Sequence, residues 1–134
     1  MSLQRQRLKA RLYQNRVRQG EFSPRCAICG LRATNGMAFH MHEAILTRGE
    51  VRGNKELLPE IMVPENCVLV HSSCHEHANS TENTKRCIAD LIKHEGYKSV
   101  ISWLLHMDAL MKSGLPREKI QLVKEVYDEM RDLR

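Results

Sequence analysis

The 134-residue sequence is poor in aromatic residues and has no long apolar run. Only 4% of its residues are Phe, Trp or Tyr, so Leu, Ile, Val and Met must fill most of the core. It lacks a run of about eighteen apolar residues, which a transmembrane helix needs, and its polar N-terminus does not have the pattern of a signal peptide. We therefore expect a soluble cytoplasmic protein of one domain that does not engage a membrane.

The cysteines are odd in number, which argues against a complete set of disulfides. Two of the five form a CxxC motif, at Cys26 and Cys29. In a reducing compartment such a motif favours metal thiolates over a disulfide framework. A thioredoxin-like redox pair is the alternative, but no strand-helix-strand pattern surrounds the motif.

The basic charge is concentrated at the start of the chain. The formal net charge is +5, and residues 1–25 alone carry +6, because seven Lys and Arg residues there face one acid, Glu21. This balance favours a polyanionic partner such as DNA. Residues 2–19 contain no Pro or Gly and predict a basic helix that ends near Gly20, although a solvated terminal arm is the alternative. We expect four of its cations to contact DNA: Arg5, Arg7, Lys9 and Arg11.

The next segment predicts a pair of short antiparallel strands. An Asn-Gly turn signal at 35–36 precedes an expected strand from about Met37 to Glu43. A β-branched run at 67–70 predicts the second strand. The residues between the strands, 45–66, are expected to form a long irregular loop, and a loop of this length is more often functional than incidental.

Helices are expected after the second strand. Ser72 or Ser73 should cap a helix that carries Cys74, His75 and His77. Helical periodicity predicts three further helices, at 84–93, at 97–112 and after Gly114, with Trp103 and the methionines in their core. We therefore expect a single α+β domain over residues 1–134, composed of a basic helix (1–22), a central core (23–80) and a helical part (81–134) that could support a homo-oligomer.

Two residue pairs have the spacing of a structural zinc site. Zinc prefers four ligands in a tetrahedron, usually supplied by two short loops. Cys67 could replace His71 as a ligand, but Cys67 and Cys87 stand in apolar patterns and are expected in the core. A surface position for His71 beside a buried Cys74 thiol is the structural alternative. The spacing predicts a closed Zn²⁺ site formed by Cys26, Cys29, His71 and Cys74.

Several histidines remain once the zinc site is complete. His40 and His42 stand beside Glu43 in the first strand, and His75 and His77 flank Glu76 after the second. If the two strands pair, the helix after Cys74 packs across them and brings His75 towards His42. A divalent ion beside an imidazole that accepts a proton near neutral pH could hydrolyse a phosphodiester.

The order of these motifs resembles the HNH endonucleases, and most closely the zinc-stabilised ββα-metal form found in small phage and prophage proteins. The resemblance covers residues 26–77 and rests on a CxxC motif, a strand with a central histidine, an asparagine before a second strand, and a knuckle followed by histidine. The three namesake residues are His42, Asn66 and His75.

The resemblance implies a role for each of these residues. His42 would be the general base that deprotonates the attacking water, Asn66 would steady the loop that bears this base, and His75 would bind a catalytic Mg²⁺ or Mn²⁺ ion. It thus implies a nuclease that nicks or cleaves DNA, in the cytoplasm of a bacterial host if the protein is encoded by a phage. Arg48 and Arg52 of the long loop are candidate contacts to phosphate.

The sequence departs from the family at two positions. Family members usually place Asp or His before the base as a second ligand of the ion, whereas this chain has Met41, a poor ligand for a hard ion. Either Glu43 or His40 supplies the missing contact, or His42 binds the ion and Glu43 is the base; we favour His42 as the base. The second departure is His71, where cysteine is more common.

Two other functions fit the same motifs. A zinc-ribbon module could bind DNA without catalysis, with Met41 marking a lost metal site. The protein could also be an adaptor subunit of a packaging or repair machine, with its C-terminal helices as the docking surface.

Overall fold

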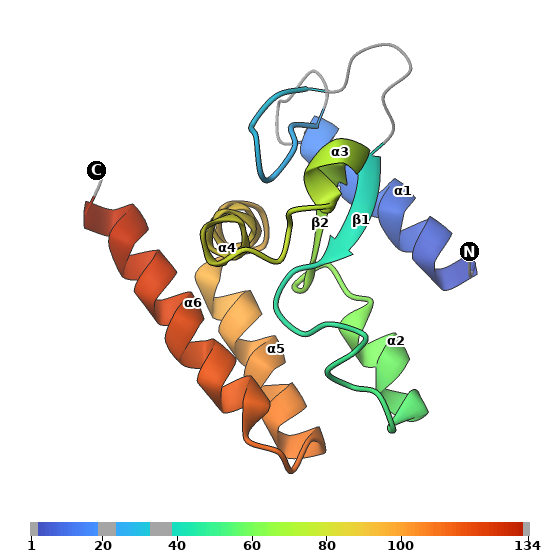
Figure 1. Ribbon diagram of the computed structural model, residues 1–134, viewed down its shortest axis with the longest axis vertical. Coiled ribbons are helices and arrows are strands. Elements are labelled where there is room, and N and C mark those ends of the chain that lie inside the picture. The colour runs from blue at the N-terminus through green and yellow to red at the C-terminus, as the bar shows by residue number, and fades with distance from the viewer. Residues whose placement is uncertain (1–2, 19–23, 33–38, 133–134) are drawn as a thin grey trace.

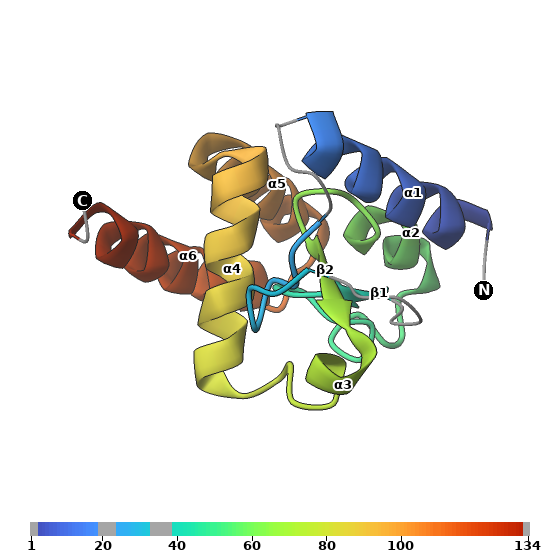
Figure 2. The ribbon, with the colours of Figure 1, turned by 90° about the horizontal axis from the view of Figure 1, so that it is seen from above.

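The computed structural model describes residues 3–18, 24–32 and 39–132, and within them the protein is an α+β fold with one small sheet (Figure 1). The strands β1 (Phe39–Glu43) and β2 (Cys67–His71) pair in antiparallel orientation, with His42 opposite Val68. All five residues of β2 are buried, because α1 packs on one side of the strand and α4 on the other (Figures 1 and 2). The two predicted strands are confirmed, although the turn at 35–36 and the start of the first predicted strand lie outside the described residues.

The basic N-terminal helix is α1 (Leu3–Arg18). Leu8 and Leu12 are four residues apart and therefore share one face of the helix, and both are buried in the core. Gln4 also donates a hydrogen bond to the carbonyl of Pro59. These contacts confirm the predicted helix, and the alternative of a solvated arm is wrong for this segment.

The segment between the strands contains more regular structure than its breakers predict. A 3₁₀ turn, η1 (Lys55–Leu57), leads into the one-turn helix α2 (Leu58–Ile61), and Pro59 stands in its first turn, where its missing N–H costs nothing. The indole N–H of Trp103 donates to the carbonyl of Glu60 at 3.0 Å and so ties α2 to the helical part. The expected irregular loop is therefore partly helical and attached at its far end.

The short helix α3 (Ser72–His75) follows β2 without a loop. Because β2 continues to His71, that residue occupies the N-cap position, and no side chain there accepts a capping hydrogen bond. The expected cap at Ser72 or Ser73 is wrong, since both serines lie inside the helix. His77 lies in the turn after α3 and not on the helix.

The helical part consists of α4 (Thr81–Glu95), α5 (Tyr97–Leu110) and α6 (Leu115–Asp132). They pack against one another, with α4 crossing α5 and α6 (Figure 2). One continuous core joins them to the sheet and includes Trp103, Met107, Cys67 and Cys87, as predicted. Gly96, with φ of 91°, makes the sharp break between α4 and α5 that a residue with a Cβ would resist.

In the part of the chain that the structure describes, no helix is both long enough and apolar enough to cross a membrane.

Candidate metal centre and histidine pocket

Three cysteines and one histidine meet at the end of β2 that joins α3. One ligand atom from each lies within 4.8 Å of the others. In a zinc tetrahedron with Zn–S bonds of about 2.3 Å, neighbouring sulfur atoms are about 3.8 Å apart, so a small contraction would close the group around an ion. Among the residues that the structure describes, this is the one group of at least three such side chains that meets this condition, and it consists of Cys26, Cys29, His71 and Cys74.

Backbone contacts hold the first pair of ligands in place. Gly30, with φ of 77°, reverses the chain after Cys29, and its N–H donates to the carbonyl of Cys26. The N–H of Ala27 donates to the carbonyl of Leu69 at 3.0 Å and fixes the knuckle to β2. The Cys26 sulfur accepts hydrogen bonds from the backbone N–H groups of Ile28 and His71, both at 3.4 Å. These backbone hydrogen bonds hold the two cysteines of the knuckle in place beside β2.

The electrostatics of the cluster suit a cation. Burial acts to raise the pKa of the Cys26 thiol, but hydrogen bonds from the backbone and from Cys29 outweigh it and lower that pKa. Burial and the neighbouring sulfurs of Cys26 and Cys29 raise the pKa of Cys74 to about 11. A second thiolate is therefore disfavoured beside the first unless a positive ion neutralises them. The donor set fits a structural metal ion such as zinc.

His71 faces the cluster with its Nδ1 atom, which lies 3.3 Å from the sulfur of Cys29. Its ring is buried and stacks on Phe39, with ring centroids 5.2 Å apart and planes 11° from parallel. Its other nitrogen, Nε2, finds no hydrogen-bond partner among the described residues. Packing therefore orients this ring, and the alternative of a surface histidine is wrong.

A second group of histidines gathers beside α3. In β1 the side chains alternate, so His40 and His42 share the face of the strand on which His75 lies. His40 Nδ1 is 3.2 Å from His75 Nδ1, and the ring centroids of His42 and His75 are 5.1 Å apart. The expected approach of His75 to His42 is thus present. His40, which was one of two candidates for the missing second ligand, belongs to the same group, as the two-residue period of the strand indicates.

The histidine pocket, as we call it, is an open hollow of about 460 Å³ beside this group. Its lining comes from β1 and from α3 with its following turn: His40, Ser72, Ser73, His75 and Glu76. Glu43 is not part of the lining, because it lies on the other side of β1. A small charged group could enter this pocket and reach the imidazoles of His40 and His75, whereas the buried His42 is not part of the lining.

His42 does not have the unperturbed pKa that its proposed role assumed. Burial, followed by repulsion from a protonated His75, lowers the pKa of His42 to about 4, although Glu43 acts in the opposite direction. Burial and the neighbouring His40 also lower the pKa of His75. Both rings are therefore neutral near pH 7, with a lone pair available for a proton or a metal ion.

Glu43 and Arg5 are engaged with each other. Arg5 Nη1 lies 3.0 Å from a Glu43 carboxylate oxygen, and Arg5 Nη2 donates to the carbonyl of Met41 at 2.7 Å. Arg48 approaches the same oxygen of Glu43 at 3.6 Å. The carboxylate that could have completed the histidine group is thus paired with guanidinium groups on the other face of β1. Arg5 contacts Glu43 and the Met41 carbonyl, and its predicted contact with DNA stays a prediction.

Asn66 is fully buried just before β2 and makes four side-chain hydrogen bonds. Its oxygen accepts from the N–H groups of Ile45 and Leu46, and its nitrogen donates to the carbonyls of Leu46 and Ile61, all between 2.8 and 3.0 Å. The side chain therefore fixes the segment that leaves β1 directly after His42 and Glu43. This is the structural part of the role that the resemblance implies for Asn66.

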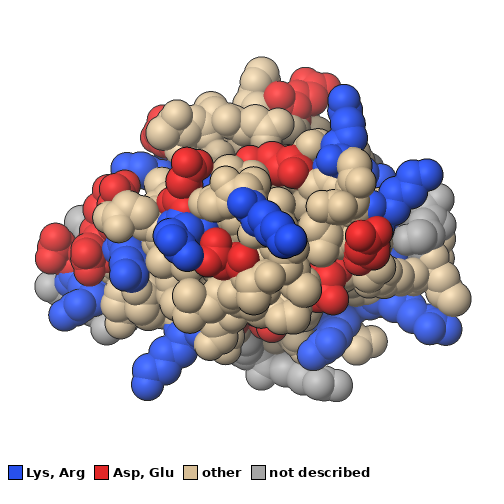
Figure 3. Space-filling view, turned by 90° about the horizontal axis from the view of Figure 1, so that it is seen from below, with Lys and Arg blue, Asp and Glu red and all other residues tan. Residues whose placement is uncertain are grey.

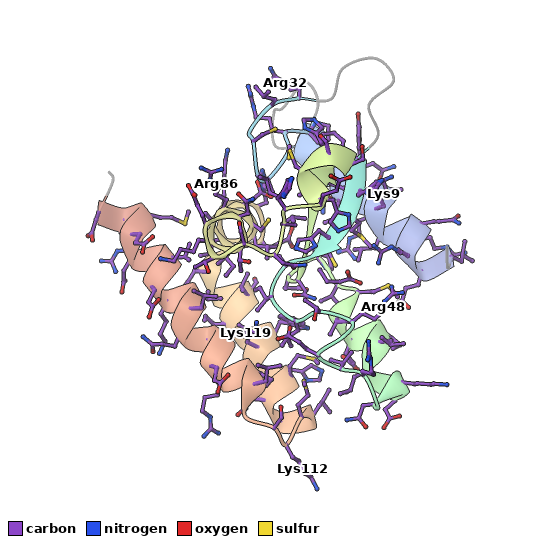
Figure 4. The ribbon with its side chains drawn as sticks, viewed as in Figure 1. Lys9, Arg32, Arg48, Arg86, Lys112 and Lys119 are labelled. Atoms are coloured by element: carbon purple, nitrogen blue, oxygen red, sulfur yellow. The ribbon has the colours of Figure 1, made fainter. Side chains whose placement is uncertain are left out.

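The remaining predicted DNA contacts lie on the surface. Arg7 and Arg11 are exposed and Lys9 is half-buried on α1, while Arg48 and Arg52 line a hollow of about 390 Å³ together with Lys55. The labelled cations in Figure 4 include Lys9 on α1 and Arg48 after β1, and others lie on α4 and at the far end of α5 and α6. On the face shown in Figure 3, basic and acidic side chains are interspersed, so that face does not form a uniform basic patch.

Comparison with models of protein families, with curated proteins and with solved structures finds no match to this chain.

Proposed function

We propose that this protein is a metal-dependent endonuclease of the HNH type, in which β1, β2 and α3 form a ββα-metal core. The observation that carries the proposal is the group of three neighbouring imidazoles on one face of this segment, two of them with lowered pKa values. They stand next to a cysteine cluster that could hold a structural zinc ion. Resemblance of motif order supports the proposal independently of the geometry.

In this proposal His42 accepts the proton of the water that attacks the scissile phosphate. It is neutral at pH 7 and can accept a proton without first losing one, although its pKa of about 4 makes it a weaker base than a free imidazole. His75 would contribute to a divalent-ion site, and a bound ion would polarise the phosphate and stabilise the departing 3′ oxygen, which leaves 5′-phosphate and 3′-hydroxyl ends. Asn66 keeps the chain after His42 in position through its four hydrogen bonds.

Basic residues around this site would bind the phosphates of DNA and so bring the DNA to it. Arg48 and Arg52, close to the Glu43 end of β1, could contact phosphates beside the cleaved bond, and the exposed cations Arg7 and Arg11 could contact phosphates farther away. Contacts of this kind carry little sequence information. They should make DNA affinity fall steeply with salt concentration.

The test is nicking of supercoiled plasmid by zinc-loaded protein with added Mg²⁺, Mn²⁺ or Ni²⁺. We expect His42→Ala to reduce the rate at least about 100-fold while keeping bound zinc and a cooperative unfolding transition. His77→Ala is the matched control, because His77 is an exposed histidine in the turn after α3. Wild-type activity in His42→Ala would remove the base assignment.

A DNA-binding module without catalysis is the second candidate function. It is favoured by Met41, which is only 3% exposed and packs in the core, so the position before His42 contributes no ligand. This candidate predicts retarded migration of DNA by the protein but no relaxation of plasmid with any of the three ions. Relaxation that stops when EDTA is added, with zinc retained by the protein, would exclude it.

A further inference from the structure

We propose that His40 and His75 together form a two-imidazole metal site that selects borderline transition-metal ions such as Ni²⁺, Co²⁺ and Zn²⁺ over Mg²⁺. The biological role of this metal site rests on the proposed function, but metal binding can be tested without nuclease activity. The proposed site includes a ligand that motif order does not supply, because His40 stands two residues before His42. It also changes the expected ion from Mg²⁺ or Mn²⁺ to a softer one.

The distance between the two imidazoles supports a shared ion. His40 Nδ1 and His75 Nδ1 are 3.2 Å apart, and the two ring planes are 83° from parallel. With metal–nitrogen bonds of about 2.0–2.1 Å, two nitrogens at this separation subtend an angle of about 100° at an ion, which lies between the octahedral and tetrahedral values. The two nitrogens are within hydrogen-bonding distance of each other, and the same spacing also suits two ligands of one ion.

The two elements that carry the pair are fixed independently of it. His40 stands on β1, whose pairing with β2 holds its backbone opposite Val70. His75 follows Cys74, which the cysteine cluster anchors. Both side chains reach the histidine pocket, so an ion can enter from solvent and keep open positions for water or phosphate.

Besides the neighbouring His42, the other candidate ligands for such an ion are two carboxylates. Glu43 is held by Arg5 at 3.0 Å and by Arg48 at 3.6 Å on the other side of β1, so its recruitment would break these ion pairs. Glu76 lines the pocket but is exposed, and it directly follows His75 in the chain. A site whose fixed ligands are two imidazoles favours Ni²⁺, Co²⁺ and Zn²⁺, whereas Mg²⁺ prefers carboxylates and water.

The experiment is calorimetric titration of the full-length, zinc-loaded protein with Ni²⁺ or Mg²⁺, with zinc release followed by a chromogenic chelator. We expect one Ni²⁺ ion to bind without release of zinc, and Mg²⁺ to bind at least about 100-fold more weakly. His40→Ala and His75→Ala should each weaken Ni²⁺ binding at least about tenfold, while His77→Ala should match the wild type. Equal affinity for Mg²⁺ and Ni²⁺ would overturn the selectivity.

Three variants separate His40 from the carboxylates. His40→Asp replaces the imidazole nitrogen with a carboxylate oxygen, which is a harder ligand. This variant should therefore bind Mn²⁺ and Mg²⁺ better than the wild type does. Glu43→Gln and Glu76→Gln should retain Ni²⁺ affinity within about twofold, since neither carboxylate is a ligand in this site. Wild-type Ni²⁺ affinity in His40→Ala, or a tenfold loss in Glu43→Gln or Glu76→Gln, would overturn the assignment of His40.

Failure of this inference is distinguishable from failure of the proposed nuclease. If plasmid is nicked but Ni²⁺ binding does not depend on His40, the inference is wrong and the nuclease stands. If Ni²⁺ binds through His40 and His75 but no ion supports nicking, the metal site stands and the nuclease is wrong.

Discussion

The cysteine cluster and the histidine pocket use adjacent residues of one short helix but are held in different ways. Cys74 belongs to the cluster and His75 to the pocket. Hydrogen bonds from backbone N–H groups fix the Cys26 sulfur, and the knuckle is attached to β2, whereas the pocket histidines meet through their side chains. The cluster therefore depends on the same backbone contacts that stabilise the fold. Substitution of His40 or His75, which line the pocket, should have little effect on folding.

The largest expected effect is loss of the cluster. Cys26→Ser removes a buried ligand that accepts two backbone hydrogen bonds, so we expect it to lose bound zinc. A loss of about 4 kcal/mol or more in unfolding free energy would lower the thermal midpoint by about 15 °C for a domain of this size. Metal analysis and thermal unfolding followed by circular dichroism measure both effects.

Cys87→Ala is the control for that substitution. Cys87 is a buried cysteine of α4 outside the cluster, so its loss leaves a small cavity that costs about 1–2 kcal/mol and keeps one zinc per chain. If Cys26→Ser kept zinc, or if both variants lost stability equally, the distinction between a built-in cluster and ordinary core cysteines would fail.

Asn66 should give the next largest effect, because it fixes the backbone that leaves β1 after His42. Asn66→Ala removes the side-chain partner of two N–H groups and two carbonyls in the core, at a cost of about 3–5 kcal/mol in unfolding free energy. Denaturant unfolding measures this cost, with the exposed Asn79→Ala as the matched control. A cost below about 1 kcal/mol would mean that the segment after His42 is held by other contacts.

The ligands of the cluster could be predicted from sequence because they depend on short spacing and on scarce residue types. Cys26-x2-Cys29 and His71-x2-Cys74 specify two local turns, and few other residues could serve. The strands and the four longest helices were also predictable, because periodicity and turn residues are local signals. These local signals cannot specify which side of a helix or strand packs against a second helix or strand that is distant in sequence.

Three differences between prediction and structure follow from this limit. The pairing of Arg5 with Glu43 spans 38 residues and depends on how α1 packs beside the sheet. The N-cap of α3 shifts because β2 continues to His71. The lowered pKa of His42 depends mainly on burial, which neighbouring residues do not specify, although the approach of His75, its second cause, was predicted. The position of His40 is a different case, since strand alternation alone places it with His42.

An effect of intermediate size is expected in the pH dependence of the unfolding free energy, where the contribution of His42 can be distinguished from that of the cysteine cluster. Its pKa is about 4 in the folded protein and near 6.5 when unfolded, so the unfolded state binds more protons between these values. The stability that neutral His42 contributes is therefore fully present above pH 6.5 and is lost as pH falls towards 4; allowing for solvent screening, it amounts to about 1–3 kcal/mol.

The measurement is the unfolding free energy of the wild type and of His42→Gln at several pH values between 7 and 4.5. At each pH the value of the variant is subtracted from that of the wild type, so that the effect of protonating the zinc ligands cancels. We expect the wild type to lose more stability than the variant on acidification. An NMR titration of His42 with a midpoint near 6.5, or parallel curves for the two proteins, would contradict the lowered pKa.

The smallest expected effect distinguishes two arginines on α1. Arg5 has a half-buried guanidinium that bridges Glu43 and the carbonyl of Met41, so Arg5→Gln should lower the unfolding free energy by about 1 kcal/mol. Arg7 is exposed, so Arg7→Gln should change stability by less than about 0.5 kcal/mol. In DNA binding the order should reverse, with Arg7→Gln reducing the slope of log affinity against log salt by about 1, as expected for one lost phosphate contact. Equal behaviour of the two variants in both measurements would mean that α1 acts as one uniform basic surface. The contacts of Arg5 with Glu43 and Met41 would then not stabilise β1.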